Sequence, residues 1–296
     1  MNENAFAIVG IRSDLAVSPT YKKAPFWKNK PVVSAAILAV IILCCLFANV
    51  IMTKDPTYMD LVNYSKAPCQ EFLFGTDTMG RDIFSMIWYG GRISLFISLI
   101  ATLISTVIAI VYGAVSGIAP EWLDVLMMRF TEILLSVPSL LIVIFIQAII
   151  GQSNALTIAI VIGVTSWMSI AKIIRTEVRQ IRNSEYVVAS KCMGGRFFHI
   201  LWWHLAPNFI SSIMFMVVMS IRSAIVSEST LSFMGIGLPL EIISWGSMLS
   251  LSEKALLTGA WWIILVPGVF LVVTLMCVTN IGNYLRREAN RKQSNI

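Results

Sequence analysis

Residues 93–118 read ISLFISLIATLISTVIAIVYGAVSGI, a run of 26 residues without a single Asp, Glu, Lys or Arg. A segment that crosses a membrane as a helix needs about 20 consecutive apolar residues, because the helix then satisfies its own backbone hydrogen-bonding groups in lipid. Of the 296 residues in the chain, 57% are hydrophobic and 13% are charged, and the mean hydropathy is +0.80. So much apolar surface is typical of an integral membrane protein and not of one soluble domain.

Five further stretches are long and apolar enough to span a membrane, some of them by extending into their flanking residues. They are Val32–Met52, Ile133–Ile150, Ala155–Ala171, Leu205–Ile221 and Ala255–Leu285. A shorter apolar patch at 231–240 contains Gly235, Gly237 and Pro239, so we expect a re-entrant or interfacial segment there. The sequence therefore predicts an all-α membrane protein with six transmembrane helices.

The basic residues are distributed unequally between the two sides that six spans define. Sixteen Lys and Arg residues lie in 1–31, at Arg129, in 172–196 and after Leu285, whereas five lie in the segments on the opposite side. Basic residues accumulate on the cytoplasmic side of membrane proteins, so we expect both termini in the cytoplasm. The predicted organisation is a cytoplasmic segment 1–31, a transmembrane domain 32–285 with an external segment 53–92 and a cytoplasmic loop 172–204, and a cytoplasmic tail 286–296.

Charge, cysteines and one glycine-containing loop exclude several function classes. The net charge of +6 is explained by cytoplasmic flanks in so apolar a chain, so no nucleic-acid partner is expected. The five cysteines form no C-x-x-C pair and indicate neither a disulfide framework nor a metal site. The stretch 75–82, GTDTMGRD, superficially resembles a phosphate-binding loop. Asp82, however, stands where such a loop needs Ser or Thr, so we expect no ATP hydrolysis and no catalytic residue in this chain.

The predicted cytoplasmic loop contains a short stretch suited to contact with another protein. Residues 185–193 include no Gly or Pro and can form a short helix, which Gly194 would end. Small Ala189 and Ser190 beside apolar neighbours would form a projection that fits a partner's groove. The alternative is an interfacial helix that packs on the chain's own spans.

The stretch from Tyr186 to Asn208 resembles the EAA loop of permease subunits of ATP-binding-cassette importers. Its Ala, Gly and distal Pro positions are matched, whereas Val188 replaces the Glu, a departure that resembles the dipeptide, oligopeptide and nickel branch. The resemblance implies that 185–194 is a coupling helix that docks on an ATPase. Its candidate contact residues are Glu185, Tyr186, Val188, Ala189, Ser190, Gly194 and Pro207.

Three more stretches resemble motifs of the same branch. Phe74–Leu95 reads FGTDTMGRDIFSMIWYGGRISL and resembles G-T-D-x-x-G-R-D-x-x-S-R-x-x-x-G-x-R-x-S-L, with Met86 in place of Arg. Arg129–Ser139 resembles an R-x-x-D…P-S element, with Glu132 in place of the Asp. Glu228–Gly246 resembles E-x-x-L-S-F-x-G-x-G…W-G. Together the motifs extend the resemblance over residues 30–285. Of the two permease subunits in such importers, the chain resembles the C-type subunit.

The resemblance implies the fold of a type I importer permease and a non-catalytic half of a pore in the inner (cytoplasmic) membrane. A second, homologous permease subunit would supply the other half of the pore. Two ATPase subunits would bind ATP and Mg²⁺, and an extracytoplasmic binding protein would deliver the substrate. We expect no cofactor in this chain, and membrane lipid as a further partner. The substrate is left open between peptides, nickel and metal–opine chelates.

The external segment holds the candidate contact residues for the binding protein, namely Gly75, Thr76, Asp77, Gly80, Arg81 and Asp82. They admit two interpretations. In one, the glycines permit turns and Asp77, Arg81 and Asp82 form salt links within an ordered loop. In the other, these residues form the surface that the binding protein contacts.

Arg222 and Glu228 are the candidates for a substrate path, because an ionisable residue in or near a span is costly unless it is paired or hydrated. Arg222 either pairs with Glu228 or reaches the lipid headgroups, or it lines the pore and binds a substrate carboxylate. A second function class, a self-sufficient secondary transporter or channel, would require inverted repeats or carboxylates in mid-span. The sequence displays neither feature, so it favours the importer permease.

Overall fold

The structure, a computed structural model, describes residues 30–151, 154–182, 190, 192–194, 206–239, 241–251, 255 and 258–293. This part of the chain is helical apart from its loops and one isolated bridge between Thr76 and Asp82. The helices are α1 (Val32–Leu46), α2 (Ala48–Ile51), η3 (Leu61–Asn63), α3 (Ile83–Ile118), α4 (Glu121–Ser136), α5 (Ser139–Ile150), α6 (Ala155–Thr165), α7 (Met168–Ile181), α10 (Ala206–Phe233), α11 (Trp245–Ser250) and α13 (Trp262–Gln293).

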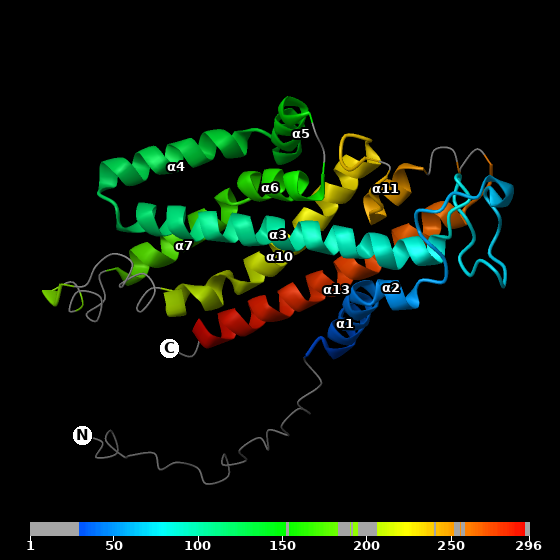
Figure 1. The fold of residues 1–296 in the computed structure, drawn as a ribbon. Helices are drawn as coiled ribbons and strands as arrows, with labels where there is room; N and C mark the ends of the chain where they lie inside the picture. Colours follow the sequence, from blue (N-terminus) through cyan, green and yellow to red (C-terminus); the bar gives the residue numbers. More distant parts are fainter. Residues whose placement is uncertain are drawn as a thin grey trace, which may run out of the picture.

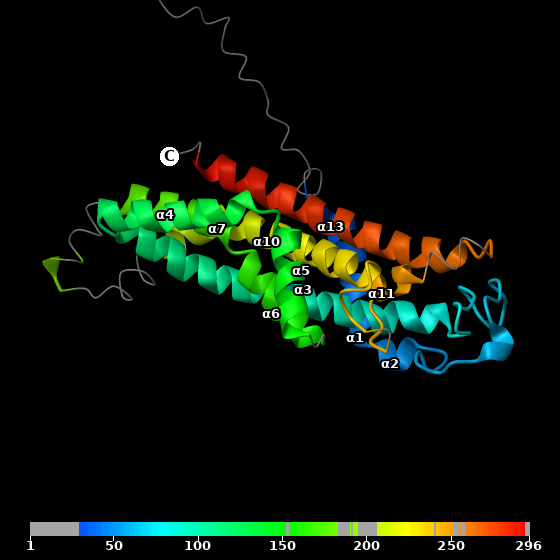
Figure 2. The ribbon, with the colours of Figure 1, turned by 90° about the horizontal axis from the view of Figure 1, so that it is seen from above.

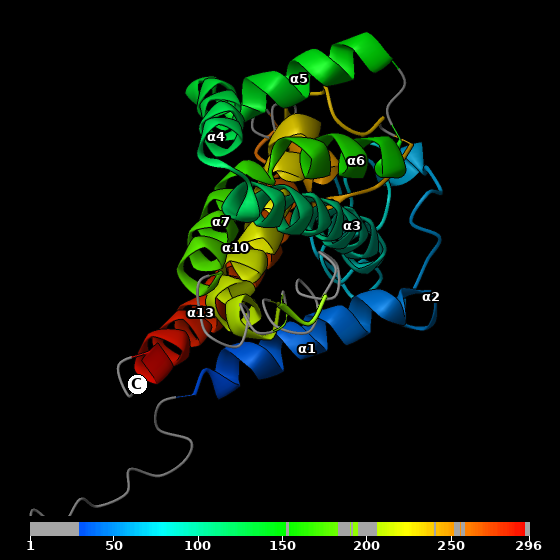
Figure 3. The same ribbon diagram turned by 90° about the vertical axis from the view of Figure 1, so that its left-hand side faces the viewer.

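The three longest helices, α3, α10 and α13, run alongside one another and form the centre of the bundle (Figure 1; Figure 2). One end of the bundle, called the loop end below, holds residues 52–82. At the opposite end α3, α7 and α13 finish and α10 begins (Figure 1). Figure 3 shows α4 and α5 on one side of this centre and α1 on the other.

Three described helices are long and apolar enough to cross a membrane: α3, the Ile213–Phe233 part of α10, and the Trp262–Ala289 part of α13. The pairs α4–α5 and α6–α7 pass the same test only together, and they bend by 85° and 43° at their breaks. Helix α1 is apolar but has only 15 residues. The described residues therefore contain three candidate spans, or up to five if each bent pair is one span.

Helix α3 begins at Ile83, ten residues before the predicted start of the span at Ile93. Hydrogen bonds of two side chains, Asp82 and Arg92, stabilise this additional part of the helix. Asp82 is the N-cap and accepts a hydrogen bond from the N–H of Ser85. Arg92, which appeared to limit the apolar run, donates to the carbonyls of Cys45 and Leu46 at 3.2 and 3.3 Å. These carbonyls lie at the end of α1, where the helical hydrogen bonding is interrupted before α2 begins. With 36 residues and a length of about 54 Å, α3 is longer than the hydrocarbon core of a membrane is thick.

The prediction of one continuous helix over Ile133–Ile150 is wrong. Helix α4 already begins at Glu121 and ends at Ser136, and α5 begins at Ser139. Between them Val137 is extended, with φ −93° and ψ 132°, as expected for a residue that precedes proline. Pro138 therefore ends α4, and α5 leaves at 85° to it.

The predicted span Ala155–Ala171 is also divided, at Ser166 and Trp167 between α6 and α7. Trp167 is only 7% exposed, and its ring lies 4.5 Å from that of Tyr112 on α3. The bend thus occurs beside a buried aromatic contact. No proline marks this break, so its position could not be inferred from the sequence.

Two further boundaries differ from expectation. Helix α10 does not end at Ile221 but continues to Phe233, so the first residues of the predicted interfacial patch 231–240 belong to it. Gly235, with φ +74°, then turns the chain toward α11. The last long helix begins at Trp262, seven residues after the predicted start at Ala255.

Close contact between α3 and α7 depends on two glycines. A Cβ atom at Gly113 would lie 2.6 Å from the carbonyl oxygen of Ala171, and one at Gly117 would lie 2.6 Å from Cγ1 of Val178. Larger residues at either position would separate the two helices. The end of α3 and the whole of α7 therefore form one closely packed unit.

Candidate functional site

The GTDTMGRD segment at the loop end is buried and organised by one carboxylate. Asp77 and Arg81 are 1% and 3% exposed, and Arg81 Nε donates to Asp77 Oδ2 at 2.7 Å. The other oxygen of Asp77 accepts the N–H groups of Met79 and Arg81, both at 2.8 Å. The predicted salt link between Asp77 and Arg81 is confirmed.

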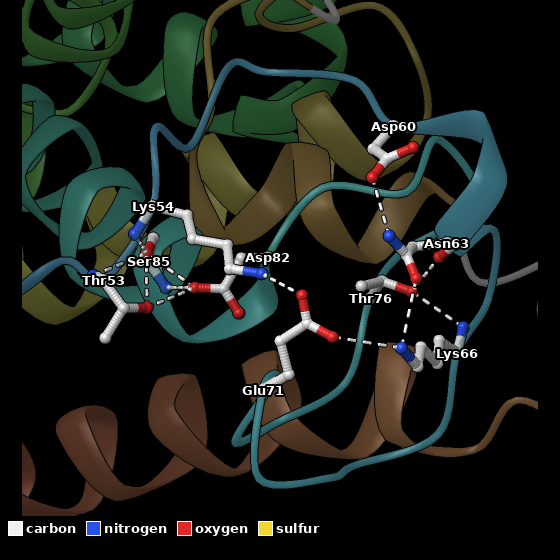
Figure 4. Close-up of polar contacts among 9 residues, drawn as sticks. All are labelled: Thr53, Lys54, Asp60, Asn63, Lys66, Glu71, Thr76, Asp82 and Ser85. Atoms are coloured by element: carbon white, nitrogen blue, oxygen red, sulfur yellow. Dashed lines mark hydrogen bonds and ion pairs between the residues drawn. The ribbon is translucent and has the colours of Figure 1, made fainter.

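Asp82 belongs to a different group of contacts, so the prediction that it joins these salt links is wrong. Its Oδ2 accepts the Ser85 N–H at 3.1 Å, the Ser85 hydroxyl at 2.6 Å and the Thr53 hydroxyl at 3.0 Å (Figure 4). A carboxylate at a helix N-terminus finds these donors in place of a cation. Asp82 thereby joins the segment after α2 to the start of α3.

A second part of the loop, residues 58–66, covers the GTDTMGRD segment and is called the covering segment below. The Thr76 hydroxyl accepts from the Lys66 N–H at 2.7 Å and donates to the Asn63 carbonyl at 2.5 Å (Figure 4). Gly80, with φ +73°, lies so close that a Cβ atom would be 1.7 Å from the Asp60 carbonyl oxygen. Exposed apolar side chains at this end include Tyr58, Met59, Leu61 and Val62 of the covering segment, and Leu73.

The sequence interpretation assigned contact with a binding protein to the buried segment 75–82, and the structure places other side chains at the surface of this end. Thr76, Asp77, Arg81 and Asp82 are each 3% exposed or less, whereas Val62 is 94% exposed. The available signal was the apolar character of 58–62 within an otherwise polar external segment.

Glu71 joins the covering segment to the residues that follow α2. Its carboxylate accepts from Lys54 Nζ at 3.0 Å and from Lys66 Nζ at 3.3 Å (Figure 4). Both ammonium groups also lie over the ring of Phe72, at 3.6 and 5.2 Å from its centroid. The hydrogen bond from Lys54, together with that from Lys66, holds the pKa of the Glu71 carboxyl below its ordinary value of 4.5.

Glu228 is fully buried in α10, and serine hydroxyls surround its carboxylate. The donors are Ser244 at 2.7 Å, Ser232 at 3.0 Å, Ser94 at 3.1 Å and Ser229 at 3.4 Å. Ser94 also accepts from the Trp245 N–H at 3.2 Å, and the Trp245 indole donates to the Ile87 carbonyl at 3.0 Å. One carboxylate therefore joins α3, α10 and α11.

Arg222 lies on a different face of α10 from Glu228. It is exposed and lines a groove of about 370 Å³ against α13, beside Met276, Thr279 and Asn280. Within the described residues neither an ion pair nor a hydrogen bond of Arg222 is found, so the pairing with Glu228 is not present there. Its role in a substrate path stays a prediction.

Most of the predicted coupling helix lies outside the described residues, including Glu185, Tyr186, Val188 and Ala189. Of the remaining candidates, Ser190 is 4% exposed. Gly194 has φ +83°, the left-handed conformation that commonly follows the end of a helix. Pro207 lies in α10, whose described part begins at Ala206.

Asp124 accepts four hydrogen bonds near this loop, and the sequence interpretation missed it. It is 1% exposed and accepts from Arg175 Nε at 2.7 Å, from Arg175 Nη2, from Arg179 Nη1 at 2.8 Å and from the Ser116 hydroxyl at 2.6 Å. Arg182 adds a bond to the Gly117 carbonyl at 3.1 Å. The end of α3, the start of α4 and α7 are thus joined just before residues 183–189. The available signal was the i, i+4 spacing of Arg175 and Arg179 on α7, which places both on one face of the helix.

Comparisons with known proteins cover most of the chain. Residues 109–291 match the family described as "Binding-protein-dependent transport system inner membrane component". The chain is 36% identical over 268 residues to the oligopeptide transport system permease protein OppC of Bacillus subtilis, covering 90% of this chain and 87% of that protein. It is 35% identical over 232 residues to the dipeptide transport system permease protein DppC of the same organism, covering 78% and 72%. It is 36% identical over 279 residues to OppC of Haemophilus influenzae, covering 91% and 87%.

Proposed function

The chain belongs to the family of binding-protein-dependent transport system inner membrane components, and we propose that it is one of two permease subunits of an ATP-driven peptide importer. The similarity to the oligopeptide permease OppC over 90% of the chain carries this proposal. The named relatives concern oligopeptides and dipeptides, so peptides are the proposed substrates. Nickel and metal–opine chelates, which the motifs left open, are not part of the proposal.

The proposed topology has six spans with both termini in the cytoplasm. They are α1 with α2, α3, the pair α4–α5, the pair α6–α7, α10 and α13. Helices α1 and α2 together cover 32–51, about the length that a membrane requires. The excess of basic residues near the opposite end supports a cytoplasmic location for that end and an external one for the loop end.

In the proposed mechanism, this chain transmits motion and hydrolyses nothing itself. Residues 185–194 dock on an ATPase, one of two such subunits that bind ATP and Mg²⁺ in the complex. Because Asp124 ties α7 to α3 and α4, movement of that loop is passed to three helices together as a rigid body. A binding protein delivers the peptide at the loop end, where Tyr58, Leu61 and Val62 are the proposed contacts.

Purification from native membranes in mild detergent tests this proposal. We expect the tagged chain to co-purify with a second permease and two ATPase subunits. A chain that purifies alone and moves solute along an ion gradient would instead be a secondary transporter, and the proposal would be wrong. Glu132→Gln, which alters an exposed residue of α4, provides a tagged control with unchanged assembly.

A further inference from the structure

A pocket of about 390 Å³ lies where both bent helix pairs meet α10. Its lining includes residues on both sides of each break and one face of α10. Six of the lining side chains carry hydroxyl groups, namely Ser139, Thr165, Ser166, Ser169, Ser220 and Ser223. The described residues that line it include no acidic or basic side chain.

The two helix breaks open directly onto this pocket. Val137 and Pro138 of the first break and Ser166 of the second are among the lining residues. Each break frees backbone polar groups from helical hydrogen bonds. In a membrane such groups are tolerated only where they are buried in protein or line a hydrated cavity. Transporters commonly place their binding sites at helices interrupted in this way.

The serine hydroxyls of this pocket differ from most others in the long helices. Most other hydroxyls of these helices have a partner: some bond to a carbonyl of their own helix, as Ser105 does to Thr102 at 3.0 Å and Thr274 does to Phe270 at 2.8 Å, and others bond to a carboxylate, as Ser94 does to Glu228. In the described part of the chain, no hydrogen-bond partner is found for the hydroxyls of five lining serines, Ser139, Ser166, Ser169, Ser220 and Ser223. These hydroxyls are free to donate to, and accept from, a solute.

Three methionines, Met168, Met216 and Met219, line the same pocket. The flexible, polarisable thioether of methionine adapts to surfaces of different shape and is common where a protein binds varied partners. The lining therefore combines unpartnered hydroxyls with an adaptable apolar surface and no fixed charge.

We propose that this pocket binds the main chain of the peptide in transit, with its serine hydroxyls bonding to peptide amides and its methionines accommodating different side chains. This inference rests on the proposed function and assigns to this subunit a substrate site. Because the lining has no fixed charge, the site accepts acidic, neutral and basic peptides alike.

The test is peptide uptake into proteoliposomes that contain the complete transporter, with Ser169→Ala, Ser220→Ala and Ser223→Ala combined in this chain. The probes are Ala-Ala-Ala, Ala-Lys-Ala and Ala-Asp-Ala below saturation. Loss of a neutral hydrogen bond lowers binding by roughly 2- to 10-fold, so we expect uptake of all three peptides to fall at least about tenfold. Co-purification of the subunits and ATP hydrolysis without binding protein should remain at wild-type levels. The single variant Ser223→Ala, at an exposed position, should show a smaller loss in the same direction.

The matched control combines Ser105→Ala, Thr230→Val and Thr274→Val, whose hydroxyls bond within their own helices and lie outside the pocket lining. Its uptake should equal that of the wild type. Unchanged uptake in the serine variants, or a loss restricted to one charge class of peptide, would overturn the inference while the proposed function stands. A wild-type complex that carries none of the three peptides would overturn both.

Discussion

At the scale of single residues, Glu228 shows how a carboxylate can be kept inside a membrane protein without a cation. Four serine hydroxyls donate to it, and two of these, Ser94 and Ser244, come from outside α10. Burying a polar group is costly unless it is hydrogen-bonded, and these donors meet that condition. The sequence identified Glu228 as unusual but not its partners, because they are up to 134 positions away along the chain.

Replacing Glu228 by alanine should destabilise the subunit strongly. Three or more buried hydroxyls would lose their acceptor, and a cavity would remain, so we expect the free energy of unfolding to fall by about 3–5 kcal/mol. The measurement is the thermal unfolding midpoint of the purified complex. Ser229→Ala, which removes the longest of the four bonds at 3.4 Å, should change this midpoint little. Equal midpoints for Glu228→Ala and the wild type would contradict a structural role for this carboxylate.

At the scale of helices, we expect motion to pass through the contact between Asp124 and the arginines of α7. We expect Asp124→Asn to lower the amount of peptide carried per ATP hydrolysed, because a neutral amide no longer forms ion pairs with Arg175 and Arg179 and so weakens the link between α4 and α7. Parallel assays of uptake and ATP hydrolysis measure this ratio.

Glu132→Gln makes the same chemical change on α4 but affects only exposed pairs, with Arg129 and Lys172, worth at most about 1 kcal/mol. It should retain the wild-type ratio of uptake to hydrolysis. A similar loss in both variants would show that charge on α4, and not the link to α7, is responsible.

The loop end should respond to acid through Glu71. Its pKa is lowered in the folded protein by Lys54 and Lys66, so its contribution to loop stability is complete above about pH 4.5 and is lost as the pH falls through the lowered pKa. A spin label on exposed Cys69 should therefore become more mobile in that range. Glu71→Gln should already show the higher mobility at pH 7. Identical mobility in both proteins at every pH would exclude this role.

How far the helices could be predicted depended on what apolar composition can reveal. It located the apolar stretches, because each requires roughly 20 residues without charge, but a straight helix and a broken one have the same composition. Pro138 was a visible signal for the first break, whereas the second lies beside the buried ring of Trp167 and has no local signature. The predicted span at Ile93 began just after Arg92, whereas tertiary hydrogen bonds make Arg92 acceptable inside α3. The span predicted to end at Ile221 likewise continues past Glu228, whose carboxylate is hydrogen-bonded inside α10.

For the whole molecule, the proposed orientation in the membrane rests on the distribution of basic residues and can be tested with the native cysteines. Cys69 and Cys192 are both exposed, at the loop end and next to the coupling segment respectively. A membrane-impermeant thiol reagent applied to right-side-out vesicles should label Cys69 and spare Cys192 until detergent is added. Cys69→Ser should abolish the labelling of intact vesicles. Labelling of Cys192 alone in intact vesicles would reverse the proposed orientation.

The central claim is that this chain is an indispensable permease subunit of an ATP-driven peptide importer, and tripeptide accumulation in proteoliposomes tests it most directly. The vesicles would hold this chain, the second permease and both ATPases, with the binding protein on the loop-end side. We predict accumulation of Ala-Ala-Ala that requires ATP, the binding protein and this chain together. Accumulation that persists when this chain is omitted, or that an ion gradient drives without the ATPases, would contradict the account.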